Sequence, residues 1–76
     1  MSWSRQLATP IALKDGRTIG TLAVARALIL SLPELHQRSP IWHETGELLA
    51  EAATDKNWVP DAEAQLSLAL KAEGLI

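Results

Sequence analysis

Cysteine, tyrosine and phenylalanine are all absent from the 76 residues. Without cysteine the chain has neither disulfides nor a thiolate zinc site to supplement its core. A domain of this length lies near the lower limit for a self-sufficient core, so we expect modest stability. Three tryptophans are the only aromatic residues, and any aromatic contact in the core or at an interface depends on them.

A long hydrophobic run is also missing. The longest apolar stretch, residues 22–32, is interrupted by Arg26 and falls far short of the roughly 20 residues of a membrane span. The N-terminal residues lack the apolar segment of a signal peptide. Seven basic and nine acidic residues give a net charge of −2, which removes the usual electrostatic reason to bind DNA or RNA. We therefore expect one cytoplasmic domain, residues 1–76, that does not contact membranes.

Residues 10–20 predict a β-hairpin. A two-residue turn at Asp15-Gly16 would leave Ile19 on the wrong face. A three-residue loop that ends with Gly16 in the left-handed conformation of a bulge pairs Ile11 with Ile19 instead. The apolar side chains of the hairpin then share one face: Ile11, Leu13 and Ile19. Such a face needs a helix to pack against, because two short strands are not stable alone.

Residues 21–32 predict a helix that is apolar around nearly its whole circumference. At 100° per residue, one broad face collects Leu22, Val24, Ala25, Leu28, Ile29 and Leu32. Leu30 lies on the other side, between Ala23 and Ala27. A helix of this kind needs cover on more than one side. We therefore expect it to be the central element of the fold or to contribute an oligomer surface.

The ends of the helices are marked by capping residues and prolines. Thr21 is a suitable N-cap for the first helix, and Pro33 ends it. Residues 33–39 form a polar connector. The second helix, residues 40–54, is amphipathic and begins at Ser39-Pro40, with the serine as N-cap.

The second helix contains Gly46 on its apolar side, where close approach of another backbone would explain a glycine. A turn over residues 55–60 follows, with Asn57 in the left-handed conformation. The last helix spans residues 61–73, and Gly74 ends it in a Schellman motif.

The order of these elements resembles a family of small bacterial proteins known as domain of unknown function 982. The residues that carry the resemblance are Pro10-Ile11, Gly16, the run 21–28, Leu32-Pro33 and the segment 72–76. The resemblance implies a fold and no more, since the family has no established activity, catalytic residues or cofactor. We predict an α+β fold: an N-terminal β-hairpin followed by three α-helices, with the first helix central.

Two surfaces are candidates for binding a partner. The first consists of Ala23, Ala27, Leu30, Trp3 and Trp58. Its helical part is either covered by the last helix within the monomer or free for self-association or a partner, and each tryptophan either packs on its own domain or acts as a binding hot spot. The second is an acidic strip on the polar side of the second helix: Glu44, Glu47 and Glu51. It is either a solvated face or a contact for a basic partner.

No residue pattern indicates catalysis or cofactor binding. His43 and Glu47 have the spacing of two metal ligands, but the further ligands of a metal site are missing. We therefore predict no catalytic, cofactor-binding or metal-binding residues and no enzyme. We expect a small interaction or regulatory module that acts through an apolar surface, as a homodimer or with an unknown protein partner. The alternative is a nucleic-acid-binding regulatory protein that uses a basic patch of Arg5, Lys14, Arg17 and Arg38.

Overall fold

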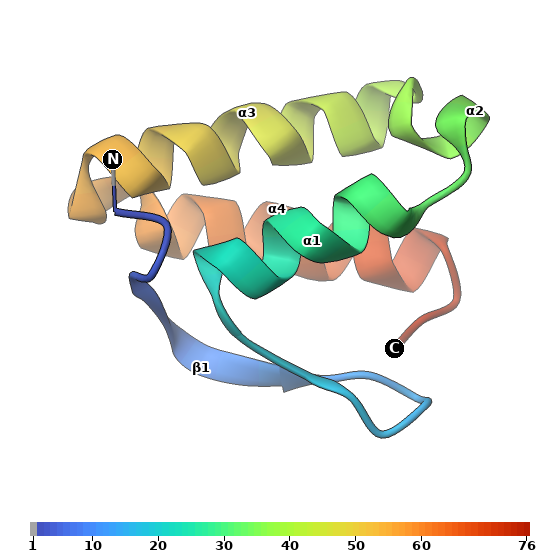
Figure 1. Cartoon of the computed structure of the whole chain (residues 1–76), viewed down its shortest axis with the longest axis horizontal. Helices are drawn as coiled ribbons and strands as arrows, with labels where there is room; N and C mark the ends of the chain where they lie inside the picture. Colours follow the sequence, from blue (N-terminus) through green and yellow to red (C-terminus); the bar gives the residue numbers. More distant parts are fainter. Residues whose placement is uncertain (1) are drawn as a thin grey trace.

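The computed structural model describes residues 2–76, and its fold is α+β (Figure 1). A hairpin of β1 (Gln6–Ala12) and β2 (Thr18–Thr21) leads into the helices α1 (Leu22–Ser31), α2 (Glu34–Gln37), α3 (Pro40–Thr54) and α4 (Val59–Ala72). The predicted order of a hairpin followed by helices is confirmed. The prediction of three helices is wrong, because the described chain has four α-helices, of which three are long.

The helical part differs from the prediction in two places, the connector after α1 and the turn before α4. The expected polar connector, residues 33–39, contains the single-turn helix α2, which begins directly after Pro33. The expected turn at 55–60 is instead a 3₁₀ turn, η1 (Lys56–Trp58), which runs directly into α4. Asn57 is not left-handed, since the positive-φ residues of the described chain are Gly16 and Gly74.

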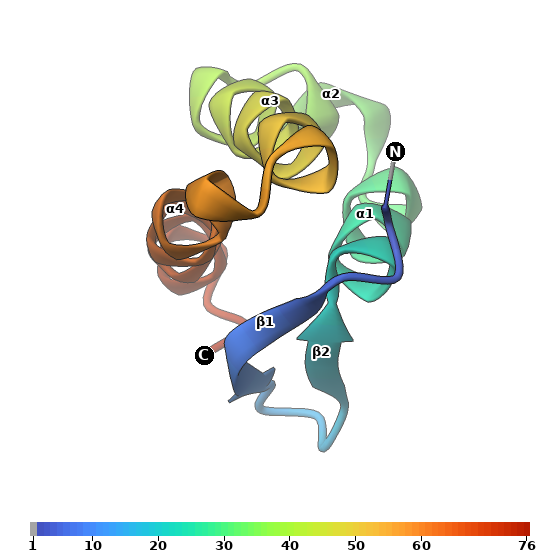
Figure 2. The same ribbon diagram turned by 90° about the vertical axis from the view of Figure 1, so that its left-hand side faces the viewer.

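The three long helices and the hairpin surround one core. Viewed end-on in Figure 2, α1 and α4 lie on opposite sides, α3 closes the top and the hairpin closes the bottom. α3 packs against both α4 and α1, while β2 contacts α1 and β1 contacts α4. The largest side chains of the core are fully buried: Trp42, Ile19, Leu22, Leu49, Leu66 and Leu70. Trp42 is the largest of them and only 1% exposed.

The bulged hairpin is confirmed. Ile11 pairs with Ile19, the Leu13 amide donates to the Arg17 carbonyl at 2.8 Å, and Gly16 has a φ of +93°. β1 begins earlier than the expected strand start at residue 10, and its register shifts between Gln6 and Ile11. These additional strand residues are anchored to α4 as well as to β2, because the Thr9 amide donates to a Glu63 carboxylate oxygen at 2.8 Å.

Capping explains where α1 and α4 begin and end. Thr21 caps α1 as expected, since its hydroxyl oxygen accepts from the Val24 amide at 3.2 Å. The Schellman motif at the end of α4 is also confirmed: Gly74 has a φ of +75°, and the Leu75 amide donates to the Leu70 carbonyl at 2.9 Å.

Ser39 precedes α3 at the expected N-cap position. Its side chain does not cap the helix, however, because the hydroxyl donates to the His36 carbonyl at 2.8 Å. The Ser39 side chain therefore links α3 to α2 instead of satisfying the first amides of α3.

α1 is not the central helix, and this expectation is wrong. It packs on α3 and β2 through one face, with Leu22, Ala25 and Leu28 buried. Leu30 is 61% exposed, so the last helix does not cover it within the monomer. A central position of α1 therefore does not support a docking surface, and only the exposed face itself supports one.

Replacing glycine with alanine is expected to change the free energy of unfolding in opposite directions at two sites. Gly46 lies inside α3 with nothing within 4 Å of the position that a Cβ would occupy, so the close backbone approach expected there is wrong. We expect Gly46→Ala to raise the free energy of unfolding by about 0.5–1 kcal/mol, because alanine has the higher helix propensity. Gly16→Ala also meets open space but has to adopt a positive φ, so we expect a loss of about 1–2 kcal/mol. Urea unfolding measures both, and changes of the same sign would contradict this account.

Candidate functional site

The exposed side of α1 is a continuous apolar surface. Four side chains at helical spacing form this surface, which we name the outer face of α1: Ala23, Val24, Ala27 and Leu30. Val24 is 44% and Leu30 61% exposed. The hydroxyl of Ser31, at the end of the face, donates to the Leu28 carbonyl at 2.6 Å and is thus satisfied within the helix. Exposed apolar patches of this kind are typical of interaction sites.

The single charged side chain of α1 lies at the border of this face. The Arg26 guanidinium carbon stands 5.0 Å from the centroid of the Trp3 ring, within the range of a cation–π contact. The Trp3 carbonyl accepts from the Ala23 amide at 2.7 Å, which holds the N-terminal segment against α1. Trp3 is therefore next to the outer face, as the candidate partner surface requires.

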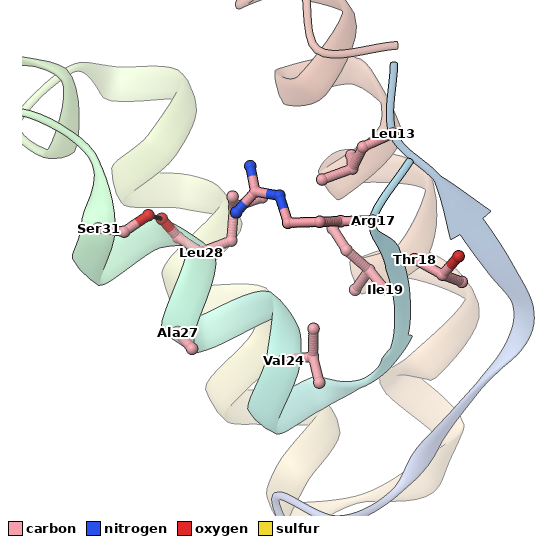
Figure 3. A pocket seen from close by; sticks show the side chains of 8 residues that line it. All are labelled: Leu13, Arg17, Thr18, Ile19, Val24, Ala27, Leu28 and Ser31. Carbon is pink, nitrogen blue, oxygen red and sulfur yellow. Dashed lines mark hydrogen bonds between the residues drawn. The ribbon is translucent and has the colours of Figure 1, made fainter. Parts of the chain in front are cut away.

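A groove separates α1 from β2, and Figure 3 shows the side chains that line it. Its volume is about 180 Å³, and its lining residues are Leu13, Arg17, Thr18, Ile19, Val24, Ala27, Leu28 and Ser31. The lining is apolar apart from Arg17, Thr18 and Ser31. Because Val24 and Ala27 belong to both features, the groove continues the outer face of α1 toward the hairpin.

The acidic strip forms a separate site on α3. Glu44, Glu47 and Glu51 line a shallow depression of about 590 Å³, and Trp58 from η1 lies in the same depression. The structure thus places Trp58 with the acidic strip and not with the outer face of α1. His43 lies beside Glu47, with 3.0 Å between Nε2 and Oε1. Carboxylates beside an exposed indole are the chemistry that binds a cationic side chain.

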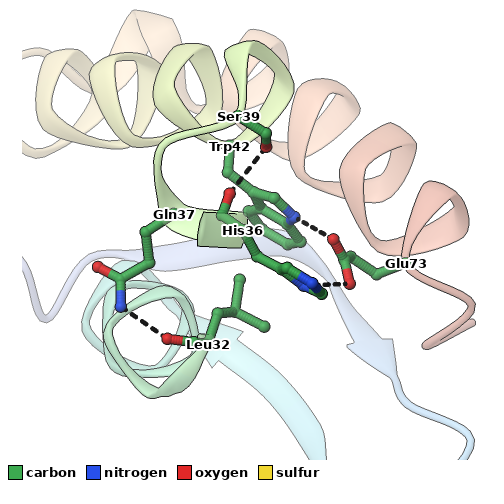
Figure 4. Close-up of polar contacts among 6 residues, drawn as sticks. All are labelled: Leu32, His36, Gln37, Ser39, Trp42 and Glu73. Carbon is green, nitrogen blue, oxygen red and sulfur yellow. Dashed lines mark hydrogen bonds and ion pairs between the residues drawn. The ribbon is translucent and has the colours of Figure 1, made fainter. Parts of the chain in front are cut away.

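A polar cluster joins α2, α3 and α4 (Figure 4). The Glu73 carboxylate at the end of α4 accepts from Trp42 Nε1 at 3.0 Å and contacts His36 Nδ1 at 3.1 Å. On the other side of α2, Gln37 donates to the Leu32 carbonyl at 2.7 Å. The cluster holds α2 between the ends of α1 and α4. Sequence reasoning missed it because its partners are far apart in the chain and follow no local spacing.

Two of the four side chains of the expected basic patch are paired with carboxylates. Arg17 pairs with Asp15 at 2.6 Å, and Arg38 pairs with Glu34 at 2.6 Å. The Arg17 amide, and then its guanidinium, lower the pKa of the Asp15 carboxyl below its ordinary value. Arg5 has its Nε buried without a hydrogen-bond partner, which withdraws part of its charge from solvent.

Two features are absent from residues 2–76. They contain no group of three or more His, Cys, Asp or Glu side chains placed to hold a metal ion. None of their helices has the length and apolar content needed to cross a bilayer.

The Glu73 cluster predicts a large difference between two substitutions at one residue. Glu73→Ala leaves the buried Trp42 N–H without its acceptor, which we expect to lower the free energy of unfolding by about 1–3 kcal/mol. Glu73→Gln keeps a carbonyl oxygen as acceptor and is expected to restore most of this loss. Urea unfolding followed by tryptophan fluorescence measures both variants. Equal stability of Glu73→Ala and the wild type would show that the indole hydrogen bond contributes nothing.

Comparisons of the chain with protein-family models, with curated proteins and with solved structures gave no match. The resemblance to family 982 therefore stays a prediction, and inferences about function depend on the geometry of the two surfaces.

Proposed function

We propose that the chain is a small non-enzymatic interaction module that binds a protein partner, or a second copy of itself, through the outer face of α1. One observation carries the proposal: a whole helix face is exposed and apolar, and the only charged side chain of that helix lies over an indole at the border of the face. Burial of one leucine side chain provides about 1.5–3 kcal/mol, which corresponds to a tenfold or greater change in affinity.

The position of the polar side chains supports a binding role over a catalytic one. His36 and Glu73, the pair most similar to a catalytic dyad, hold α2 against α4 and share their hydrogen bonds with a buried tryptophan. The carboxylates of the acidic strip are exposed on α3, whereas a pair of carboxylates that acts in acid–base catalysis needs a partly buried site.

The acidic strip provides a second contact for the same function. Its depression with Trp58 suits a basic segment of a partner, and such a contact weakens as salt rises. The outer face of α1 behaves differently, because apolar contacts survive high salt. The two surfaces can therefore be distinguished by ionic strength.

The alternative, a nucleic-acid-binding regulator, has less support. It needs a surface with net positive charge, and the charges of Arg17 and Arg38 are each offset by a paired carboxylate. Retention on heparin that disappears at moderate salt would favour this alternative over our proposal.

The proposal predicts that Leu30→Glu strongly weakens binding of the partner. We expect at least about a tenfold loss of the proteins captured on the immobilised chain from extract of the source cells, because the substitution places a carboxylate in the apolar contact. The measurement is quantitative mass spectrometry of the captured proteins at high salt. Self-association, followed by sedimentation equilibrium, is expected to fall by the same factor if the partner is a second copy.

Leu68→Glu is the matched control. Leu68 is 57% exposed, close to the exposure of Leu30, but lies on α4. Leu68→Glu introduces the same charge on a different helix and is expected to leave partner capture and self-association unchanged. Equal losses for the two variants, or no loss for Leu30→Glu, would contradict the proposal.

A further inference from the structure

β2 has a free edge that faces the groove. The Leu13 amide donates to the Arg17 carbonyl, so this carbonyl points toward β1. The directions of the backbone N–H and C=O groups alternate along an antiparallel strand. Those of Ile19 therefore also point toward β1, while those of Thr18 and Gly20 point away from it. The sheet of the described chain has two strands only, and the N–H and C=O groups of Thr18 and Gly20 therefore form an open edge.

The groove lies along this edge. In Figure 3, β1 flanks β2 on one side and α1 lies across the groove on the other. A chain placed beside Thr18 and Gly20 would direct alternate side chains toward Val24 and Ala27 of α1. The groove volume of about 180 Å³ is slightly larger than that of an engineered cavity of about 150 Å³ that holds benzene, and is thus large enough for one aliphatic side chain.

We infer that the partner adds an extended peptide segment to the edge of β2, as a third strand with an aliphatic side chain in the groove between β2 and α1. This inference rests on the proposed function and specifies the chemistry of its partner. An extended backbone satisfies the hydrogen bonds of the open edge, which a helical partner does not. The apolar lining of the groove then favours segments that place an aliphatic side chain in it.

The guanidinium of Arg17 adds a second element of recognition through its free N–H donors. Arg17 is the charged residue of the lining, and its guanidinium reaches from the hairpin toward α1 (Figure 3). Its Nε donates to Asp15 at 2.6 Å, which uses one of the five N–H donors of the group. The remaining donors suit a carboxylate, so the segment carries an acidic side chain beside Arg17.

The test uses a phage-displayed library of random peptides, selected on the immobilised wild-type chain. Synthetic peptides from the selection are then bound to the ¹⁵N-labelled chain, and amide hydrogen exchange is followed by NMR. We expect the Thr18 and Gly20 amides to exchange quickly in the free chain and at least about tenfold more slowly in the complex. Selected sequences are expected to share an aliphatic residue and a nearby acidic group.

Two proline variants form a matched pair, because Ala12 and Thr18 are directly opposite each other in the hairpin. Thr18→Pro removes an N–H from the open edge, while Ala12→Pro removes one from the opposite edge of β1. We expect about a tenfold loss of peptide affinity for Thr18→Pro and no loss for Ala12→Pro. Circular dichroism checks that both variants fold, and amide exchange in the wild-type chain tests the inference even if they do not.

Several outcomes would overturn the inference. One is a library that yields no specific peptide, and another is a bound peptide that leaves the Thr18 and Gly20 amides unprotected. A third is protection of these amides in the free chain that rises with its concentration, since a second copy would then occupy the edge. If Leu30→Glu abolishes partner capture while any of these results holds, the proposed function stands and only strand addition fails.

Discussion

α1 has apolar side chains on two opposite sides, and the rest of the chain covers one of them. The inner side is buried against α3 and β2, where Leu22, Ala25 and Leu28 enter the core. α4 lies on the far side of the core and does not cover the outer side. The elements of residues 2–76 form one layer around the core, and none of them packs over the outer side of α1. The exposed face of α1 follows from this arrangement.

Trp42 fixes the arrangement that leaves this face open. It is the largest fully buried side chain of the core, and its N–H donates to Glu73 at the end of α4. The same carboxylate contacts His36 and so positions α2 at the end of α1. The polar cluster thereby closes one end of the core without covering the outer face of α1. A rigid support of this kind suits a binding surface, because little order has to be gained on binding.

Local patterns in the sequence were sufficient for the hairpin and for most helix ends. The alternation of Ile11, Leu13 and Ile19 around Gly16 allows one register only, and that register is the observed one. Thr21 and Gly74 likewise act through neighbours a few residues away. These contacts join residues that are close together in the sequence, and for this reason they could be predicted from it.

Features that depend on distant segments could not be predicted in the same way. Periodicity shows that two sides of α1 are apolar but not which side the chain covers, and the expected central position was therefore wrong. On α4, Glu63 accepts from the Thr9 amide of β1 and Leu68 is exposed, and neither position follows from the spacing of residues within the helix. The position of Trp58 in the same depression as the acidic strip and the open edge of β2 also follow only from the assembled fold.

The most direct test of the exposed face uses the absence of cysteine from the chain. Single-cysteine variants Ala27→Cys and Leu68→Cys each carry one thiol, whose alkylation rate reports access to that helix face. In purified dilute protein, we expect both thiols to react quickly. In extract of the source cells, the rate at Ala27→Cys is expected to fall about tenfold as a partner excludes solvent from α1, while Leu68→Cys stays fast. Equal rates at the two positions in the extract would contradict a partner on the outer face of α1.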